Sequence, residues 1–295
     1  MSRFKHIIYG VEARIATITI NRAEHMNTIS VPVMYEMIDA LDKADADDDV
    51  RVVIFTGAGD RAFCAGADLS GGSDSFDLEG GESKVDLPKI DGVYRDWGGM
   101  LTTRLFRCLK PVIAVVNGAS AGIGATMQAA MDIRIASNKA KYVFPFTRRG
   151  IVPDAASSWF LTQIVGLPTA LDWTMTGRVV PPEEALEKGM VSALHAPEDL
   201  MPAALKIARE IVENTSPVAV AQTRQMMWHF ATADHPMAVH IADSRALQMR
   251  GASADTREGI AAFLEKRHPD FPDKVSDGLP LTFPDRSPSN EPVQT

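Results

Sequence analysis

The chain has 295 residues, of which 45% are hydrophobic, and its 38 acidic and 30 basic residues give a formal charge of −8. This composition is ample for a packed core, and the negative balance argues against a nucleic-acid partner. Two cysteines are too few for a disulfide framework or a cysteine-based zinc site. The seven histidines show no ligand spacing, so we expect no metal site. No stretch has the length of a signal-peptide or membrane-spanning apolar run, so we expect a soluble, cytoplasmic protein without membrane insertion.

The first half of the chain is predicted to alternate strands with helices. Apolar residues alternate with threonine over residues 15–20, and residues 31–46 place apolar side chains on one helical face. Two further strands are predicted at 51–56 and 111–116, each ended by a glycine-containing turn. Strands separated by helices favour parallel crossover connections, and this order predicts an α/β fold.

The second half is predicted to be mainly helical. Apolar stripes with helical period occupy residues 200–212, 218–230, 237–249 and 256–267. Residues 70–92 are polar and rich in glycine, which is typical of a mobile surface loop that could form a lid. From residue 269 onward prolines recur among Asp and Ser, so we expect residues 269–295 to form an extended or disordered tail.

Two segments of small residues are candidates for ligand contact. Residues 63–69 follow a predicted strand, and small residues allow the backbone to approach a ligand closely. Residues 117–124 lead from another strand into a helix that begins near Ala125, where unpaired N–H groups can receive negative charge. Each segment alone is equally compatible with a tight turn that binds nothing.

Together, these segments resemble the crotonase (enoyl-CoA hydratase/isomerase) superfamily over roughly residues 5–270. The matching segments, in chain order, are 21–23 with 26–27, 63–69, 110–132, 150–153, 161 with 165–166, 176–178, 185 with 189–191, and 258–259 with 262–267. The resemblance implies a ββα spiral core over residues 1–197 and a C-terminal helical oligomerisation region over 198–268. It also implies an acyl-CoA substrate, no separate cofactor, and assembly as a homotrimer or dimer of trimers.

By the same resemblance, the backbone N–H groups of Ala67 and Ile123 form an oxyanion hole. Two such donors polarise a thioester carbonyl, acidify the α-proton and stabilise the resulting enolate. Ile123 replaces a glycine of many hydratases, which narrows the pocket but keeps the donor. The remaining candidate contacts to the substrate and its CoA are Arg22, Ala65, Gly66, Asp68, Leu69, Gly122, Thr126, Phe146 and Arg149. Phe263 and Lys266 match positions that touch CoA, often from a neighbouring subunit; a core aromatic and a surface lysine are the alternatives.

The sequence departs from the well-studied hydratases at their two catalytic glutamates. Thr126 and Phe146 stand there, and neither exchanges protons near neutral pH. Asp154 is the nearest alternative, since some isomerases of the superfamily carry their acid, and a dehalogenase its nucleophile, at the matching position. An apolar pocket would raise the pKa of this aspartate towards neutrality. Its other interpretation is a helix N-cap, because it follows a proline and precedes Ala-Ala-Ser-Ser.

The sequence therefore predicts an enoyl-CoA hydratase or isomerase in which Asp154 moves protons. Arg149, with Arg148, would meet a polar acyl end or CoA phosphates, or form a solvated turn. Two alternatives stay open. Residues 118–122 match the Gly-x-Ser-x-Gly pattern of a nucleophile elbow, which would make the protein a hydrolase using Ser120, and Asp154 could itself serve a hydrolase. A non-catalytic acyl-CoA-binding homologue is the other.

Overall fold

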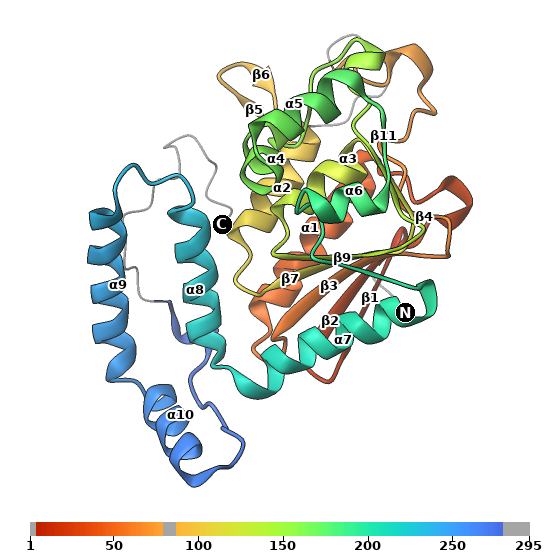
Figure 1. Ribbon diagram of the computed structural model, residues 1–295. Helices are drawn as coiled ribbons and strands as arrows, with labels where there is room; N and C mark the ends of the chain where they lie inside the picture. The colour runs from red at the N-terminus through yellow and green to blue at the C-terminus, as the bar shows by residue number, and fades with distance from the viewer. Residues whose placement is uncertain (1–3, 79–86, 280–295) are drawn as a thin grey trace.

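A computed structural model describes residues 4–78 and 87–279 of the chain (Figure 1). Its main sheet has the order β1-β2-β3-β7-β9-β12. The strands are β1 (Ile7–Glu12), β2 (Ile15–Ile20), β3 (Val52–Gly57), β7 (Val112–Val116), β9 (Ile133–Ser137) and β12 (Ala193–His195). β1 and β2 form an antiparallel pair, and every other neighbouring pair is parallel. The predicted strands and the parallel α/β arrangement are thus confirmed.

Both faces of the main sheet are covered, which explains the nearly continuous apolar runs of its central strands β3 and β7. On one face, Val53 and Phe55 of β3 join the largest core cluster, together with α1 (Val31–Ala46) and α2 (Trp97–Arg107). On the other, Val52 and Ile54 pack against α7 (Pro197–Asn214). The helix predicted at 31–46 has these bounds in the structure.

A second, smaller sheet has the order β11-β10-β8-β4. It consists of β4 (Ala62–Cys64), β8 (Ala119–Ala121), β10 (Lys141–Val143) and β11 (Val179–Val180). β4 and β8 are parallel neighbours, so both chains leave the sheet at the same edge. A short hairpin, β5 (Lys89–Ile90) and β6 (Val93–Tyr94), begins inside residues 70–92, the loop predicted as a possible lid. Part of that loop, residues 79–86, lies outside the described residues.

Short helices and 3-10 turns connect the strands. They are α3 (Ile123–Thr126), α4 (Ser157–Val165), α5 (Leu167–Thr176) and α6 (Pro182–Glu187), with the 3-10 turns η1 (Ala23–His25), η2 (Gly72–Asp74), η3 (Met127–Ala130) and η4 (Thr147–Arg149). The helix expected near Ala125 begins at Ile123. It is a single turn that continues as η3.

The last helices form an arm that projects from the core (Figure 1). They are α8 (Pro217–His229), α9 (Pro236–Gly251) and α10 (Ala254–Glu265), within two residues of the predicted bounds. The chain then returns through η5 (Val275–Asp277), where Val275 is buried and Ser276 bonds Asp48. Residues 280–295 of the predicted tail lie outside the described residues. In the described part of the chain, no helix has the length and apolar character required to span a membrane.

Candidate active site

A small cavity lies where the chains leaving β4 and β8 meet η4. The carboxyl ends of adjacent parallel strands meet at one sheet edge, which brings segments distant in sequence together. Nine of the residues predicted from the sequence line this cavity: Ala65, Gly66, Ala67, Leu69, Gly122, Ile123, Phe146, Arg149 and Asp154.

The two predicted oxyanion residues, Ala67 and Ile123, lie on facing segments of the cavity. Among the residues that the structure describes, neither N–H donates a hydrogen bond to the protein, whereas the N–H of Asp68 donates to Ile29 (2.8 Å). Ile123 is the first residue of α3, where N–H groups lack helical acceptors. Gly122 adopts a φ of 52°, a conformation that favours glycine, and it turns the chain into this helix. Both donors are therefore available to a ligand.

The two segments approach each other through their backbones. A Cβ placed on Gly124 would lie 2.0 Å from the carbonyl oxygen of Cys64, and one on Gly66 would lie 3.0 Å from that of Ala121. Glycine at these positions sets the spacing between the loops that carry Ala67 and Ile123.

Asp154 faces the cavity with a carboxylate that is ready to bind a proton. Its Oδ1 accepts a hydrogen bond from Oγ1 of Thr126 (3.1 Å). Burial, followed by the negative charge of Asp96, raises the pKa of Asp154 to about 7, although the bond from Thr126 acts in the opposite direction. The N-cap interpretation is wrong: the cap of α4 is Ala156, and no side chain caps this helix.

Asp96 is a neighbour that the sequence analysis missed. It lies at the N-cap of α2, and its Oδ2 also accepts the N–H of Ala155, the residue after Asp154, at 2.6 Å. An aspartate before a helical apolar stripe signals a cap in the sequence. The contact with Ala155 spans 59 residues and has no local signal.

The wall of the cavity that contains Phe146 and Arg149 is fixed to α5. Oγ1 of Thr147 donates to the carbonyls of Thr174 and Met175, both at 3.0 Å. Nε of Arg148 donates to the carbonyl of Thr176 (2.6 Å), which turns this side chain away from the cavity lining. Arg149 lines the cavity and, in the described part of the chain, its side chain has no anionic partner.

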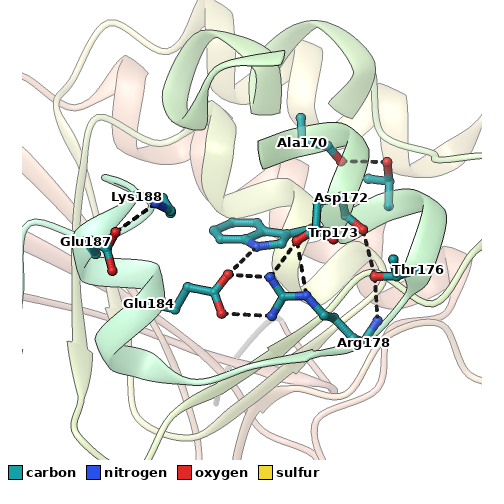
Figure 2. Close-up of polar contacts among 9 residues, drawn as sticks. Ala170, Asp172, Trp173, Thr176, Arg178, Glu184, Glu187 and Lys188 are labelled. Atoms are coloured by element: carbon teal, nitrogen blue, oxygen red, sulfur yellow. Dashed lines mark hydrogen bonds and ion pairs between the residues drawn. The ribbon is translucent and has the colours of Figure 1, made fainter. Parts of the chain in front are cut away.

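Figure 2 shows the network that holds the end of α5. Arg178 bridges Asp172 of α5 and Glu184 of α6, each at 2.5 Å from Nη2. Glu184 also accepts Nε1–H of Trp173 (2.9 Å), and the bonds from Arg178 and Trp173 help to lower the pKa of Glu184 to about 2. The Trp173 ring stacks on Phe144, two residues before Phe146. The network therefore supports the cavity wall from behind.

Arg22, Asp68 and Thr126 are not among the residues that line the cavity. Nη2 of Arg22 pairs with Oδ2 of Asp68 at 2.9 Å, and Nη1 bonds the carbonyl of Thr28 at 2.6 Å. The bond from Arg22 lowers the pKa of Asp68. This pair joins the start of η1 to the segment that carries Ala67. Thr126 is buried and meets the site through Asp154.

Phe263 and Lys266 lie far from the cavity within one chain. They are at the end of α10, which lies on the projecting arm, away from β4 and α3 (Figure 1). The segments that follow β4 and β8 line the cavity. Phe263 is 81% exposed, so the core-aromatic interpretation is wrong. A contact with CoA from these residues would have to reach the site of another subunit.

The nucleophile-elbow interpretation of Ser120 is wrong. Ser120 lies within β8, between β4 and β10, and not at a turn from strand to helix. Its side chain is 1% exposed, and its Oγ accepts a hydrogen bond from Nε2 of Gln128 (2.9 Å). It does not line the cavity, so it cannot meet a substrate there.

A cavity with two available backbone donors, at the edge of the second sheet of an α/β fold that ends in a helical arm, fits the crotonase class of acyl-CoA enzymes. The family model for enoyl-CoA hydratase/isomerase matches residues 10–274, and the chain belongs to this family. It is thus an enzyme acting on CoA thioesters, and the non-catalytic alternative is set aside.

Several relatives are similar over most of their length. An enoyl-CoA hydratase of Alternaria alternata, AFT3-1, is 39% identical over 88% of this chain and 84% of its own. The 1,2-epoxyphenylacetyl-CoA isomerase of Escherichia coli is 32% identical over 91% and 98%. Among solved structures, an enoyl-CoA hydratase from Bacillus anthracis aligns with a TM-score of 0.81 and 28% identity, covering 90% of this chain and 99% of the other. The crotonase-like fold predicted from the sequence is thereby confirmed.

Proposed function

We propose that the enzyme moves a carbon–carbon double bond within an enoyl-CoA thioester, from the 3-position to the conjugated 2-position. Asp154 is the proton-transfer group, and the N–H groups of Ala67 and Ile123 bind the thioester oxygen. The observation that carries this proposal is the cavity lining, in which Asp154 is the one carboxylic acid among the described residues.

The proposed reaction has two proton transfers and consumes no water. The ionised Asp154 takes a proton from C2 of the 3-enoyl thioester, and the electron pair moves into a dienolate. Its oxygen is stabilised by the two N–H donors. The protonated Asp154 then returns the proton to C4, so the double bond ends between C2 and C3. A pKa of about 7 suits a group that must take and then give a proton near neutrality.

Hydration is the second candidate, because the family includes hydratases. Adding water to a 2-enoyl thioester needs one group to activate the water and a source of the proton for C2. Thr126 and Phe146, at the positions of the two hydratase glutamates, supply neither. Isomerisation places fewer demands on a single carboxylate, and we prefer it for this reason.

We further propose that residues 1–197 bind and transform the acyl-CoA, and that residues 198–268 assemble the chain as a homotrimer or dimer of trimers. The support is an apolar surface on the projecting arm. Its large exposed side chains are Met227, Met237, Ile241, Leu247, Met249, Ile260, Phe263 and Leu264. Exposed apolar surfaces of this kind mark interaction sites. In the assembly, Phe263 and Lys266 would contact the CoA bound by a neighbouring subunit.

The test uses 3-hexenoyl-CoA and 2-hexenoyl-CoA, followed by the absorbance of the conjugated thioester. Purified enzyme should increase this absorbance with the 3-enoyl substrate, and Asp154→Asn should lower the rate by about 100-fold or more. Asp60→Asn makes the same change in an exposed turn and should leave the rate unchanged. Loss of conjugation from the 2-enoyl substrate alone would make the enzyme a hydratase. An equal rate in Asp154→Asn would remove Asp154 from the mechanism.

A further inference from the structure

We infer that Asp96 is a positioning residue of this site: from the start of α2 it holds the segment that carries Asp154 and brings a second carboxylate near that side chain. This inference rests on the proposed role of Asp154 as the proton-transfer group. Asp96 does not line the cavity, so it would act through Asp154 and not on the substrate.

The contacts of Asp96 exceed what a helix cap requires. Its Oδ1 accepts the N–H of Gly98 and its Oδ2 that of Gly99, both at 2.9 Å, which is the usual N-cap arrangement. The third bond, from the N–H of Ala155 to Oδ2 at 2.6 Å, leaves the helix and joins it to the segment after Asp154. One carboxylate thus fixes both α2 and the backbone next to the proposed proton-transfer group.

A second bond from α2 completes this attachment. Oγ1 of Thr102 donates to the carbonyl of Ala155 at 2.9 Å, so both backbone groups of Ala155 are held by the same helix. Ala155 and Ala156 adopt φ values of 60° and 51°, in the left-handed region that is unfavourable for residues other than glycine. Such a conformation persists where surrounding contacts enforce it, as these two bonds do.

The first turn of α2 also lies against the oxyanion side of the cavity. A Cβ placed on Gly98 would be 2.9 Å from Cδ1 of Ile123 and 3.3 Å from Cβ of Ala155. The turn capped by Asp96 therefore touches the residue that carries one proposed N–H donor and the residue after Asp154. The position of this turn therefore affects how the N–H of Ile123 and the carboxylate of Asp154 are placed relative to each other.

The charge of Asp96 gives this residue an effect that a neutral cap would lack. The polar groups around Asp154 are Asp96 from α2, Thr126 from α3, Cys64 from β4 and Arg149 from η4. Burial raises the pKa of the Cys64 thiol to about 12, so it is neutral near pH 7. Of the charged neighbours, Asp96 opposes ionisation of Asp154, and its removal should move the titration of Asp154 to lower pH.

The experiment titrates the side-chain carboxyl of Asp154 directly, by carbon NMR of protein labelled at its aspartates, with Asp154→Asn to assign the signal. The test variant is Asp96→Ser, because serine is a good N-cap and carries no charge. The control is Thr102→Val, which removes the other bond to Ala155 without changing a charge. Asp96→Asn is a second charge-removing variant for use if Asp96→Ser does not fold.

We expect the titration midpoint of Asp154 to fall in Asp96→Ser and to stay near the wild-type value in Thr102→Val. With 3-hexenoyl-CoA, kcat should fall about 10- to 100-fold in Asp96→Ser through loss of alignment, with KM little changed. An unchanged midpoint would overturn the inference and leave Asp96 as an ordinary cap. Because the titration needs no turnover, a wild-type enzyme without isomerase activity would count against the proposed function and not against this inference.

Discussion

Asp154 lies beside apolar side chains and a second carboxylate, and both features disfavour its charged form. Its pKa is about 7 in the folded chain against an ordinary value of 3.8, so the folded state binds the proton more tightly than the unfolded state. The free energy of unfolding should therefore fall as the pH rises from about 4 to 7, and stay low above that range. The ionised form of Asp154, which the proposed reaction needs, therefore lowers the stability of the folded protein.

The variant Asp154→Asn removes this penalty. Since one pKa unit corresponds to about 1.4 kcal/mol, the variant should be more stable than wild type by at most about 4 kcal/mol near pH 8. The two should be equally stable near pH 4, where both side chains are neutral. Urea unfolding at both pH values measures the difference. A stability gain of the same size at both would show that ionisation is not its cause.

The N–H of Ala67 can be removed while its neighbours are kept. Ala67→Pro deletes the donor, and no hydrogen bond within the described protein is lost because this N–H has no acceptor there. Removing one oxyanion donor should lower kcat about 100- to 1,000-fold. Ala67→Gly keeps the N–H and should retain most of the activity. Equal loss in both variants would point to loop distortion rather than to the donor.

The candidate site was predictable where its signals were local. Ala67, Ile123 and Asp154 stand in short segments whose order resembles a family, and the structure places all three around one cavity. Asp96 was missed because its bond to Ala155 exists only after α2 packs beside α4. Ser120 matched a pattern by chance, since only the sheet pairing reveals that it lies inside a strand.

At the scale of elements, Gly124 controls how closely α3 approaches β4. A methyl group there would meet the carbonyl oxygen of Cys64 at 2.0 Å, and a backbone atom cannot rotate away as a side chain can. Gly124→Ala should cost about 3 kcal/mol or more and displace the N–H of Ile123. Activity should then fall even in the folded fraction.

Gly251 provides the matched control for this substitution. It ends α9, and a Cβ there would meet nothing within 4 Å. Gly251→Ala should be neutral or stabilise the protein by less than about 1 kcal/mol. Thermal unfolding and kcat measured on both variants would separate the close approach at Gly124 from a general effect of adding a methyl group.

The long elements were predictable because each carries a periodic apolar face over several turns or residues. The second sheet was not, since β4, β8, β10 and β11 have only two or three residues each. Strands this short cannot display alternation, and their small residues are equally typical of turns. The individual helices of the arm were predicted, but the direction in which the arm projects from the core depends on tertiary contacts.

At the scale of the whole molecule, Arg224 anchors α8 to the core. Its guanidinium bonds Asp132 at 2.7 Å and reaches the carbonyls of Leu105, Phe106 and Cys108, at the end of α2. Buried charges that are fully paired in this way hold one geometry, because breaking any bond leaves a charge without a partner. The arm therefore leaves the core in a defined direction, with the apolar side chains of α9 and α10 exposed.

If the arm assembles subunits, Lys266 should act on a neighbour's substrate. Lys266→Ala should raise KM for 3-hexenoyl-CoA about 10-fold, through loss of a bond to a phosphate, but not KM for the matching pantetheine thioester, which lacks the nucleotide. Leu247→Asp places a charge on a side chain that is 75% exposed on α9 and should dissociate the assembly in sedimentation. The resulting monomer, although it retains Lys266, should show the same rise in KM for 3-hexenoyl-CoA and no change in KM for the pantetheine thioester. A monomeric wild type would mean that the nucleotide is bound within one chain. The same would follow if the Leu247→Asp monomer kept the wild-type KM for 3-hexenoyl-CoA.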